Sequence, residues 1–446
     1  MDSSLGCAKL RGMSKKHPSQ RGQSRTKRPE RNQIEIRYLS LDQILDREHQ
    51  ARVVWKYVQS LDLSELYAQI RAVEGSAGRD AVDPAILLAL WLYATLKGVT
   101  SARYLETLTK ESLPYQWLCG KVSVNYHLLA DFHAHHGDLL NRLLTDSISV
   151  LLHQGLVTLD EVAQDGMRVR ASAGASSFRR EPTLKEAQQQ AREHLERLKR
   201  EQAEDPSGDD RRRQAAQLRA ASEREQRIEQ ALVELKELEA QRDLQRREPK
   251  SEARASTTDP EARKMKMANG GFNAAFNVQF ASDSATRLIV GVDVNNQGSD
   301  AGLMAPMHAE LEAHYGQVPD RYLVDGGFFK CDDVTVLEKA GTQVHSPLPR
   351  EEKQLEQGKN PYAPKKRESA EMSRLRERMG TAEAKEIYKH RCSVAEFPNA
   401  DCRNRGLQQF RVRGCVKAKA IALWYALAFN FMRFLNLGFM EKVIEG

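Results

Sequence analysis

The segment from Pro182 to Lys250 constrains the fold most, because it contains no Phe, Tyr or Trp and is dominated by charged residues, Gln and Ala. Its apolar residues recur at spacings of three and four, which predicts two amphipathic helices. The Asp205-Pro206-Ser207-Gly208-Asp209 sequence between them is a strong break. We therefore expect an antiparallel helical hairpin or coiled coil that is inserted into another domain. The two seams are Leu184, Ala187, Ala191, Leu195 and Leu198, and Leu218, Ala221, Ile228, Leu232 and Leu235.

The chain has 446 residues, enough for more than one domain with a sizeable core. Residues 34–155 are expected to form an all-α N-terminal domain that binds DNA. Residues 156–176 and 269–440 alternate strands and helices, which predicts an α/β domain. The helical insertion, 177–268, interrupts that domain.

Residues 1–33 carry nine Lys or Arg and two acidic residues, and this 9 − 2 = +7 equals the formal net charge of the whole chain. We expect a disordered basic arm of the kind that polyanion-binding proteins carry. A tail that serves only solubility is the alternative.

In the N-terminal region, helices are expected over Asp83–Lys97 and from Thr100 or Ser101 to Lys110. A longer helix is expected from Asn125 to His153, with an interruption near Gly137. Residues 100–136 form either a helix-turn-helix-like DNA reader or a plain packing domain.

Several patterns exclude other classes of protein. The six cysteines form no CxxC pair, which argues against a zinc ribbon or disulfide framework and fits a cytoplasmic protein. The N-terminus lacks the apolar stretch of a secretory signal. The apolar run from Ala420 to Phe434 is short and flanked by charges, so we expect a buried core helix and no membrane association. A cluster of histidines, His133, His135 and His136, lacks ligand partners at zinc spacing and is expected to lie on a helix surface.

The C-terminal region predicts a mixed sheet. Two antiparallel strands come first, then a helix, a strand, a helix, a further strand, a polar loop over residues 347–372 and two final helices. In that order the elements are expected at Ala275–Phe280, Arg287–Val294, Leu303–His314, Arg321–Asp325, Val334–Lys339, Thr342–His345, Ser373–His390 and Val416–Leu437.

Two aspartates, Asp165 and Asp325, each follow a short apolar run and precede a glycine. A carboxylate at the end of a core strand is rigidly held and suits a hard cation such as Mg²⁺. Phosphodiester cleavage by two metal ions needs several such carboxylates at one place. Asp293 and Asp300 remain alternative candidates for the second carboxylate.

Four blocks of sequence resemble the DDE-type transposases of bacterial insertion sequences. The blocks are Phe272-Asn273-Ala274-Ala275-Phe276-Asn277-Val278-Gln279, Asn296-Gln297-Gly298-Ser299-Asp300, Asp325-Gly326-Gly327-Phe328, and a C-terminal block with Tyr388-Lys389-His390-Arg391, Ala395-Glu396, Asn404-Arg405-Gly406 and Arg413-Gly414.

This resemblance implies a ribonuclease H-like fold and metal-dependent cleavage and strand transfer of insertion-sequence ends. It implies Asp165, Asp325 and Glu396 as catalytic residues and ligands of Mg²⁺ or Mn²⁺, with two ions expected. It also implies partners: double-stranded DNA, as terminal inverted repeats and target, and further copies of the chain in a homodimer or larger assembly. Residues expected to contact DNA are Tyr388, Arg391, Arg403, which stands where some relatives have lysine, and Arg405.

Pro398 lies two residues after Glu396, and proline is unfavourable within a helix. We therefore expect a helix to begin near Glu396, with Pro398 in its first turn. Two alternative functions remain: a nuclease of the same fold without strand transfer, and a catalytically idle DNA-binding regulator derived from a transposase.

Overall fold

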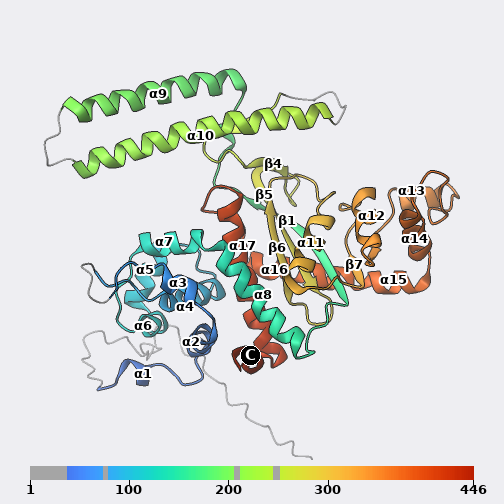
Figure 1. Ribbon diagram of the computed structural model, residues 1–446, viewed down its shortest axis with the longest axis horizontal. Coiled ribbons are helices and arrows are strands. Elements are labelled where there is room, and N and C mark those ends of the chain that lie inside the picture. Colours follow the sequence, from blue (N-terminus) through green and yellow to red (C-terminus); the bar gives the residue numbers. More distant parts are fainter. Residues whose placement is uncertain (1–37, 74–78, 205–210, 245–251, 446) are drawn as a thin grey trace, which may run out of the picture. The chain divides into compact units, whose positions relative to one another are not determined.

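A computed structural model describes residues 38–73, 79–204, 211–244 and 252–445 (Figure 1). The predicted basic arm, 1–33, lies outside the described residues. The chain divides into two units, residues 1–44 and 45–446. The described part of the first unit contains a single short helix, α1 (Leu41–Ile44).

The second unit begins with helices, as the sequence predicts. Asp83 caps α4, since its Oδ1 accepts a hydrogen bond from the Ala85 amide at 2.8 Å. The expected interruption near Gly137 is confirmed, because α7 ends at His135 and α8 begins at Gly137. The loop expected around Pro114 and Gly120 contains the helix α6, and α2 and α3 were not predicted individually. The helices are α2 (Gln50–Ser60), α3 (Ser64–Ala68), α4 (Pro84–Leu96), α5 (Ala102–Glu111), α6 (Leu113–Cys119), α7 (Tyr126–His135) and α8 (Gly137–His153).

The sheet of the second unit has the order β4-β5-β1-β7-β8, and β6 also pairs with β5. Strand β5 is antiparallel to β1, β4 and β6, whereas β1, β7 and β8 are mutually parallel. This is the predicted ribonuclease H-like mixed sheet. The strands are β1 (Glu161–Arg170), β4 (Arg263–Lys266), β5 (Phe272–Asp283), β6 (Ile289–Asn295), β7 (Arg321–Leu323) and β8 (Gln343–His345).

Helices follow the strands in the expected order, although the loop predicted at 347–372 contains the short helix α13. The helix predicted over Ser373–His390 is two helices, α14 and α15, separated at Gly380 and Thr381. These helices are α11 (Met304–Tyr315), α12 (Cys331–Lys339), α13 (Glu351–Glu356), α14 (Ala370–Met379), α15 (Ala382–Lys389), α16 (Arg391–Asn404), α17 (Cys415–Leu437) and α18 (Met440–Glu445).

Helix α17 is the buried core helix that the apolar run predicts. It is long and apolar enough to span a membrane, but 72% of its most apolar window is buried within the protein. It packs against the helices α4, α7 and α8 and against the strands β5 and β6. One hydrophobic core therefore runs from the N-terminal helices to the sheet, and the domain division expected at residue 155 remains a prediction.

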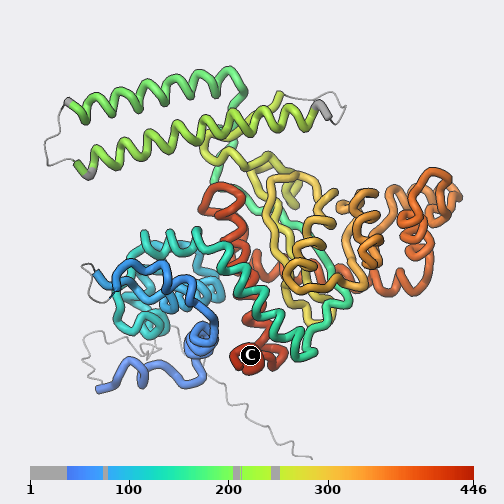
Figure 2. The backbone as a smooth tube through the Cα atoms, in the orientation of Figure 1, coloured from blue at the N-terminus to red at the C-terminus, as the bar shows by residue number. Residues whose placement is uncertain are grey.

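The expected helical hairpin is present as α9 (Glu181–Glu204) and α10 (Arg211–Leu244), which run side by side (Figures 1 and 2). The predicted break between them lies in 205–210, outside the described residues. Two short paired strands, β2 (Phe178–Arg179) and β3 (Ala255–Ser256), connect the hairpin to the rest of the chain.

Candidate active site

The parallel pairing of β1 and β7 places Asp165 beside Asp325. Ala163 of β1 is in register with Leu323 of β7, and each of these residues is followed two positions later by one of the aspartates. Side chains alternate along a strand, so Asp165 faces the same side as Ala163. Asp165 is the fifth of ten residues in β1, so the expectation that it ends its strand is wrong. The strand continues because β5 pairs with it as far as Arg170.

Helix α16 is seated on that same side of the sheet. Ala163 and Leu323 form a small buried cluster with Val394 and Ala395 of its first two turns. This cluster fixes the start of the helix, at Arg391, close to the two aspartates.

Arg391 contacts all three predicted catalytic carboxylates. Its Nη2 donates a hydrogen bond to Asp165 Oδ1 at 2.8 Å and lies 3.9 Å from Asp325 Oδ2. Its Nη1 lies 3.7 Å from Glu396 Oε1. The Arg391 side chain is only 9% exposed, whereas that of Asp325 is 44% and that of Glu396 57% exposed. The structure thus brings Asp165, Asp325 and Glu396 together around one guanidinium group.

The predicted helix start near Glu396 is wrong, because α16 begins five residues earlier and contains Pro398 within it. A proline inside a helix costs about 3 kcal/mol through a lost hydrogen bond and a steric clash. Pro398 is itself buried in a helix face that packs on β1 and β5. The burial of that helix face outweighs the unfavourable effect of proline within the helix.

Asn399 is a site residue that the sequence analysis missed. Its Nδ2 donates a hydrogen bond to Asp165 Oδ2 at 2.8 Å, so both oxygens of this carboxylate are held. Asn399 Oδ1 is buried and has no hydrogen-bond partner among the described residues. The available signal was its spacing of eight residues from Arg391, which places both residues on one face of a helix. The expectation that the helix begins near Glu396 left Arg391 outside it and hid this relation.

The environment of Asp165 perturbs its ionisation. Burial raises the pKa of Asp165, the neighbouring Arg391 lowers it, and the adjacent charge of Asp325 raises it again; the net direction is upward. Tyr388 lies near the same groups, and burial raises the pKa of its hydroxyl, while Arg391 opposes the change. Perturbed ionisation of a half-enclosed carboxylate is typical of functional sites.

A buried polar network supports the site from β5 and the loop after β6. Gln279 Nε2 and Asn277 Nδ2 donate to Asp300 Oδ1 at 2.8 and 2.7 Å, and Arg168 Nη1 donates to Asp300 Oδ2 at 2.9 Å. A Cβ atom on Gly166 would lie 2.5 Å from Asp300 Oδ1. A side chain at position 166 would therefore disturb these hydrogen bonds, so glycine is the residue that fits beside Asp165. The hydrogen bonds also join two blocks of the sequence resemblance, residues 272–279 and 296–300.

The other acidic candidate, Asp293, lies on β6 and forms an ion pair with Lys419 at 3.5 Å. Of the histidines expected on a helix surface, His135 is exposed, but His133 is stacked on Trp91 with ring centroids 3.6 Å apart. Burial lowers the pKa of His133 to about 3. It acts as a neutral packing residue.

A basic groove of about 690 Å³ adjoins the site at Gly166. Four basic side chains line it, and no acidic one does: Arg168, Arg170, Lys266 and Arg403. Arg405 lies elsewhere, since its Nε bonds Asp401 at 2.6 Å and its Nη1 donates to the Leu96 carbonyl at 2.9 Å. DNA contact by Tyr388, Arg391, Arg403 and Arg405 remains a prediction.

The donor set is chemically suited to a hard divalent cation. Asp165, Asp325 and Glu396 offer only oxygen atoms, and the carbonyl oxygen of Asn399 is buried beside them without a partner. Within the part of the chain that the structure describes, no three His, Cys, Asp or Glu side chains are already arranged around a common point for an ion. In this structure Arg391 supplies the positive charge between the acids.

Comparisons with known protein families agree with this geometry. Residues 39–134 match the family described as "Transposase domain (DUF772)", and residues 244–431 match the family described as "Transposase DDE domain". The second match includes Asp325, Arg391, Glu396 and Asn399. No curated protein and no solved structure matches the chain.

Proposed function

Because this chain belongs to the DDE-type transposases of insertion sequences, we propose that it cleaves the ends of its own mobile element and joins them to target DNA. Asp165, Asp325 and Glu396 are the catalytic carboxylates of this proposal. The single observation that carries it is the contact of Arg391 with all three acids, which come from β1, the loop after β7, and α16.

The proposed reaction has two steps. A water oxygen attacks the phosphorus at the element end, the bond to the 3′ oxygen breaks, and a 3′ hydroxyl is released. That hydroxyl then attacks a phosphodiester of the target, joining the strands and releasing a second 3′ hydroxyl. Transposases of this family use divalent metal ions, and we assign the binding of two Mg²⁺ or Mn²⁺ ions to the three carboxylates.

When bound, such ions activate the attacking oxygen and stabilise the leaving oxygen. The protein's own residues orient these groups. Arg391 and Asn399 hold the two oxygens of Asp165 in place. The network around Asp300 keeps β1 and β5 rigid next to Asp165. Such fixed geometry is required to place a nucleophile in line with the bond to be broken.

The basic groove would hold the DNA backbone beside the reacting phosphodiester. The first of its four basic side chains, Arg168, lies two residues after Gly166. Contacts of these side chains with phosphate groups would position DNA without reading its sequence. Arg403 belongs to this groove, which supports its predicted contact with DNA.

The function is tested with purified Asp165→Asn, Asp325→Asn and Glu396→Gln proteins and DNA that carries the element's own ends. Cleavage should fall by roughly a thousandfold in each, since loss of a metal ligand removes several kcal/mol of transition-state stabilisation. DNA affinity, measured by fluorescence anisotropy, should stay within about threefold of wild type. Asp293→Asn is the matched control, because Asp293 lies on β6 and pairs with Lys419 of α17, and this variant should cleave normally.

Cleavage by Asp325→Asn at the wild-type rate would remove Asp325 from the site. Pre-cleaved ends test strand transfer separately: hydrolysis without any joined product would indicate a nuclease, and DNA binding without cleavage by the wild type would indicate a regulator.

A further inference from the structure

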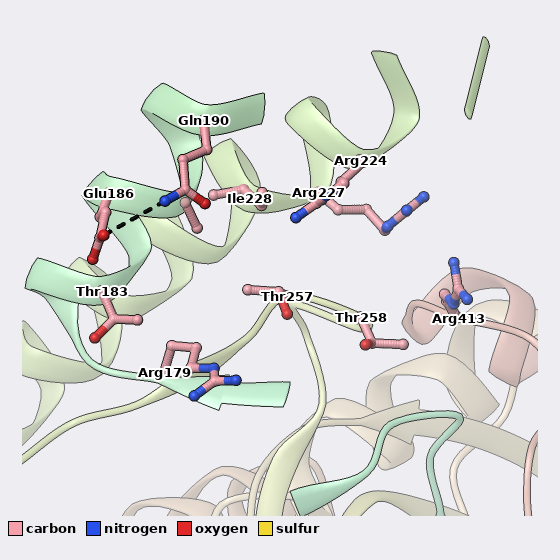
Figure 3. A pocket seen from close by; sticks show the side chains of 11 residues that line it. Arg179, Thr183, Glu186, Gln190, Arg224, Arg227, Ile228, Thr257, Thr258 and Arg413 are labelled. Carbon is pink, nitrogen blue, oxygen red and sulfur yellow. Dashed lines mark hydrogen bonds between the residues drawn. The ribbon is translucent and has the colours of Figure 1, made fainter. Parts of the chain in front are cut away.

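A second basic pocket, about 530 Å³ in volume, lies where the helical hairpin meets the rest of the second unit (Figure 3). Its arginines come from three places in the chain: Arg179 from β2, Arg224 and Arg227 from α10, and Arg413 from the segment before α17. The hydroxyl-bearing side chains of Thr257 and Thr258 lie between them (Figure 3). Folding thus gathers positive charge from segments far apart in the sequence.

These arginines have few ion-pair partners among the described residues, although Arg413 interacts electrostatically with the buried carboxyl group of Asp259. No ion pair to Arg179, Arg224 or Arg413 is formed by the described residues. Arg227 has one carboxylate nearby, Glu223 at 3.7 Å, and its Nε is buried without a hydrogen-bond partner among the residues that the structure describes. Burial lowers the pKa of Arg227, and repulsion by Arg413 and Arg224 adds to this effect, while Glu223 opposes it.

One acidic side chain, Glu186 of α9, also lines the pocket. It accepts a hydrogen bond from Gln190 at 3.5 Å. In Figure 3 Glu186 lies at the opposite side of the pocket from Arg413. Four arginines and one glutamate leave a net positive lining of 4 − 1 = +3.

We propose that this arginine pocket binds phosphate groups of the DNA backbone, so that the helical hairpin and the catalytic sheet grip the same duplex. Planar guanidinium groups bind phosphate oxygens in two places at once. Hydroxyl groups such as those of Thr257 and Thr258 add hydrogen bonds to phosphate. The contact is independent of DNA sequence. This inference rests on the proposed function, because it takes the phosphate groups to be those of the bound DNA.

The test compares wild type with the triple variant Arg224→Gln/Arg227→Gln/Arg413→Gln on a fluorescent 40-base-pair duplex, titrated at 50 to 200 mM KCl. Each lost phosphate contact lowers the slope of log affinity against log salt by about 0.9, so the slope should fall by about 2 to 3. Affinity at 100 mM KCl should fall at least tenfold. The matched control is Arg200→Gln, which removes a charge from α9 outside the pocket and should change affinity less than twofold.

The double variant Arg179→Gln/Arg413→Gln leaves α10 intact and repeats the test if the triple variant does not fold. A second arm measures thermal stabilisation by inorganic phosphate and by pyrophosphate. An unchanged salt slope in the variants would overturn the proposal. If the slope were unchanged and inorganic phosphate nevertheless stabilised the wild type but not the variants, the pocket would be a site for a free anion. If the wild-type protein bound no DNA at all, the proposed function would be overturned as well. An unchanged salt slope would overturn only the role of the pocket.

Discussion

Arg391 is the residue on which the geometry of the acidic cluster depends, because it is nearly buried and contacts Asp165, Asp325 and Glu396. A buried arginine beside carboxylates stabilises their charged forms. In Asp165 this effect opposes burial and the charge of Asp325, both of which raise the pKa. Arg391 is therefore expected to act as a positioning residue that also keeps Asp165 ionised.

Replacing Arg391 by Gln should shift the acidic limb of the pH–rate profile for DNA cleavage to higher pH. The sign follows from the pKa of Asp165: the wild-type guanidinium lowers it, so removal of Arg391 raises it and a higher pH is needed to ionise the carboxylate. The rate at high pH should fall about tenfold to a hundredfold through lost positioning. Single-turnover cleavage from pH 5 to 9 measures both effects.

Arg391→Lys is the control, because it keeps a positive charge but loses the planar fork. Its acidic limb should stay closer to that of the wild type. An acidic limb that does not move in Arg391→Gln would show that ionisation of Asp165 does not depend on this arginine.

The sequence pointed to the three acids, whose catalytic role is a proposal, but it did not indicate how their neighbours hold them in place. Asp165-Gly166 suggested the end of a strand, because Asp-Gly is common in turns. In the structure Gly166 is instead needed for the close approach of Asp300 and Gln279 within the sheet. Such a requirement comes from residues more than a hundred positions away, and local patterns do not report it.

Among the elements, apolar periodicity predicted α11, β5 and β6 well. Helix α4 was predicted from the residues at its ends, because it is buried on every side and has no distinct apolar face. Helix α16 was predicted poorly because Pro398 is a strong local signal against a helix. Its buried face, which includes Arg391 and Asn399, becomes recognisable only once the sheet that it packs against is known.

The helical hairpin is expected to be separable from the catalytic sheet. Its two ends lie close together: Arg180 and Glu252 form an ion pair at 2.6 Å, and β2 pairs with β3. Replacing residues 182–251 by a short Gly-Ser linker should leave a folded protein whose melting temperature changes by only a few degrees. Its salt slope for DNA binding should drop as in the arginine variants, because the linker removes the α10 side of the pocket.

Circular dichroism and thermal melting check the fold of the excised protein, and Ala163→Asp serves as a control for real disruption, since Ala163 is fully buried at the sheet. Loss of cooperative melting after excision would show that the hairpin is an integral part of the core.

For the molecule as a whole, α17 joins the N-terminal helices to the sheet. Trp424 lies within α17, is fully buried, and donates a hydrogen bond from its Nε1 to the His133 carbonyl of α7 at 3.1 Å. A shared core of this kind predicts that helices and sheet unfold in one step, even though the sequence suggested two domains.

Trp424→Ala should therefore lower the free energy of unfolding by about 3 to 5 kcal/mol. Hydrogen exchange should accelerate together in α4, α8 and β6, because all three pack on α17. Trp55→Ala, at a partly buried position, is the control and should cost less. Faster exchange in α4 and α8 with unchanged β6 would contradict a single cooperative core.

The shared core helix also sets the order in which the protein becomes active during synthesis. Asp165 leaves the ribosome early, but its partner Glu396 and the helix α17 that anchors the sheet come from the last quarter of the chain. In a nascent chain that lacks α16, Asp165 and Asp325 are therefore not yet assembled with Glu396 into one site. Under the proposed function, the chain cannot cleave DNA before α16, which carries Glu396, has been synthesised and has packed on the sheet.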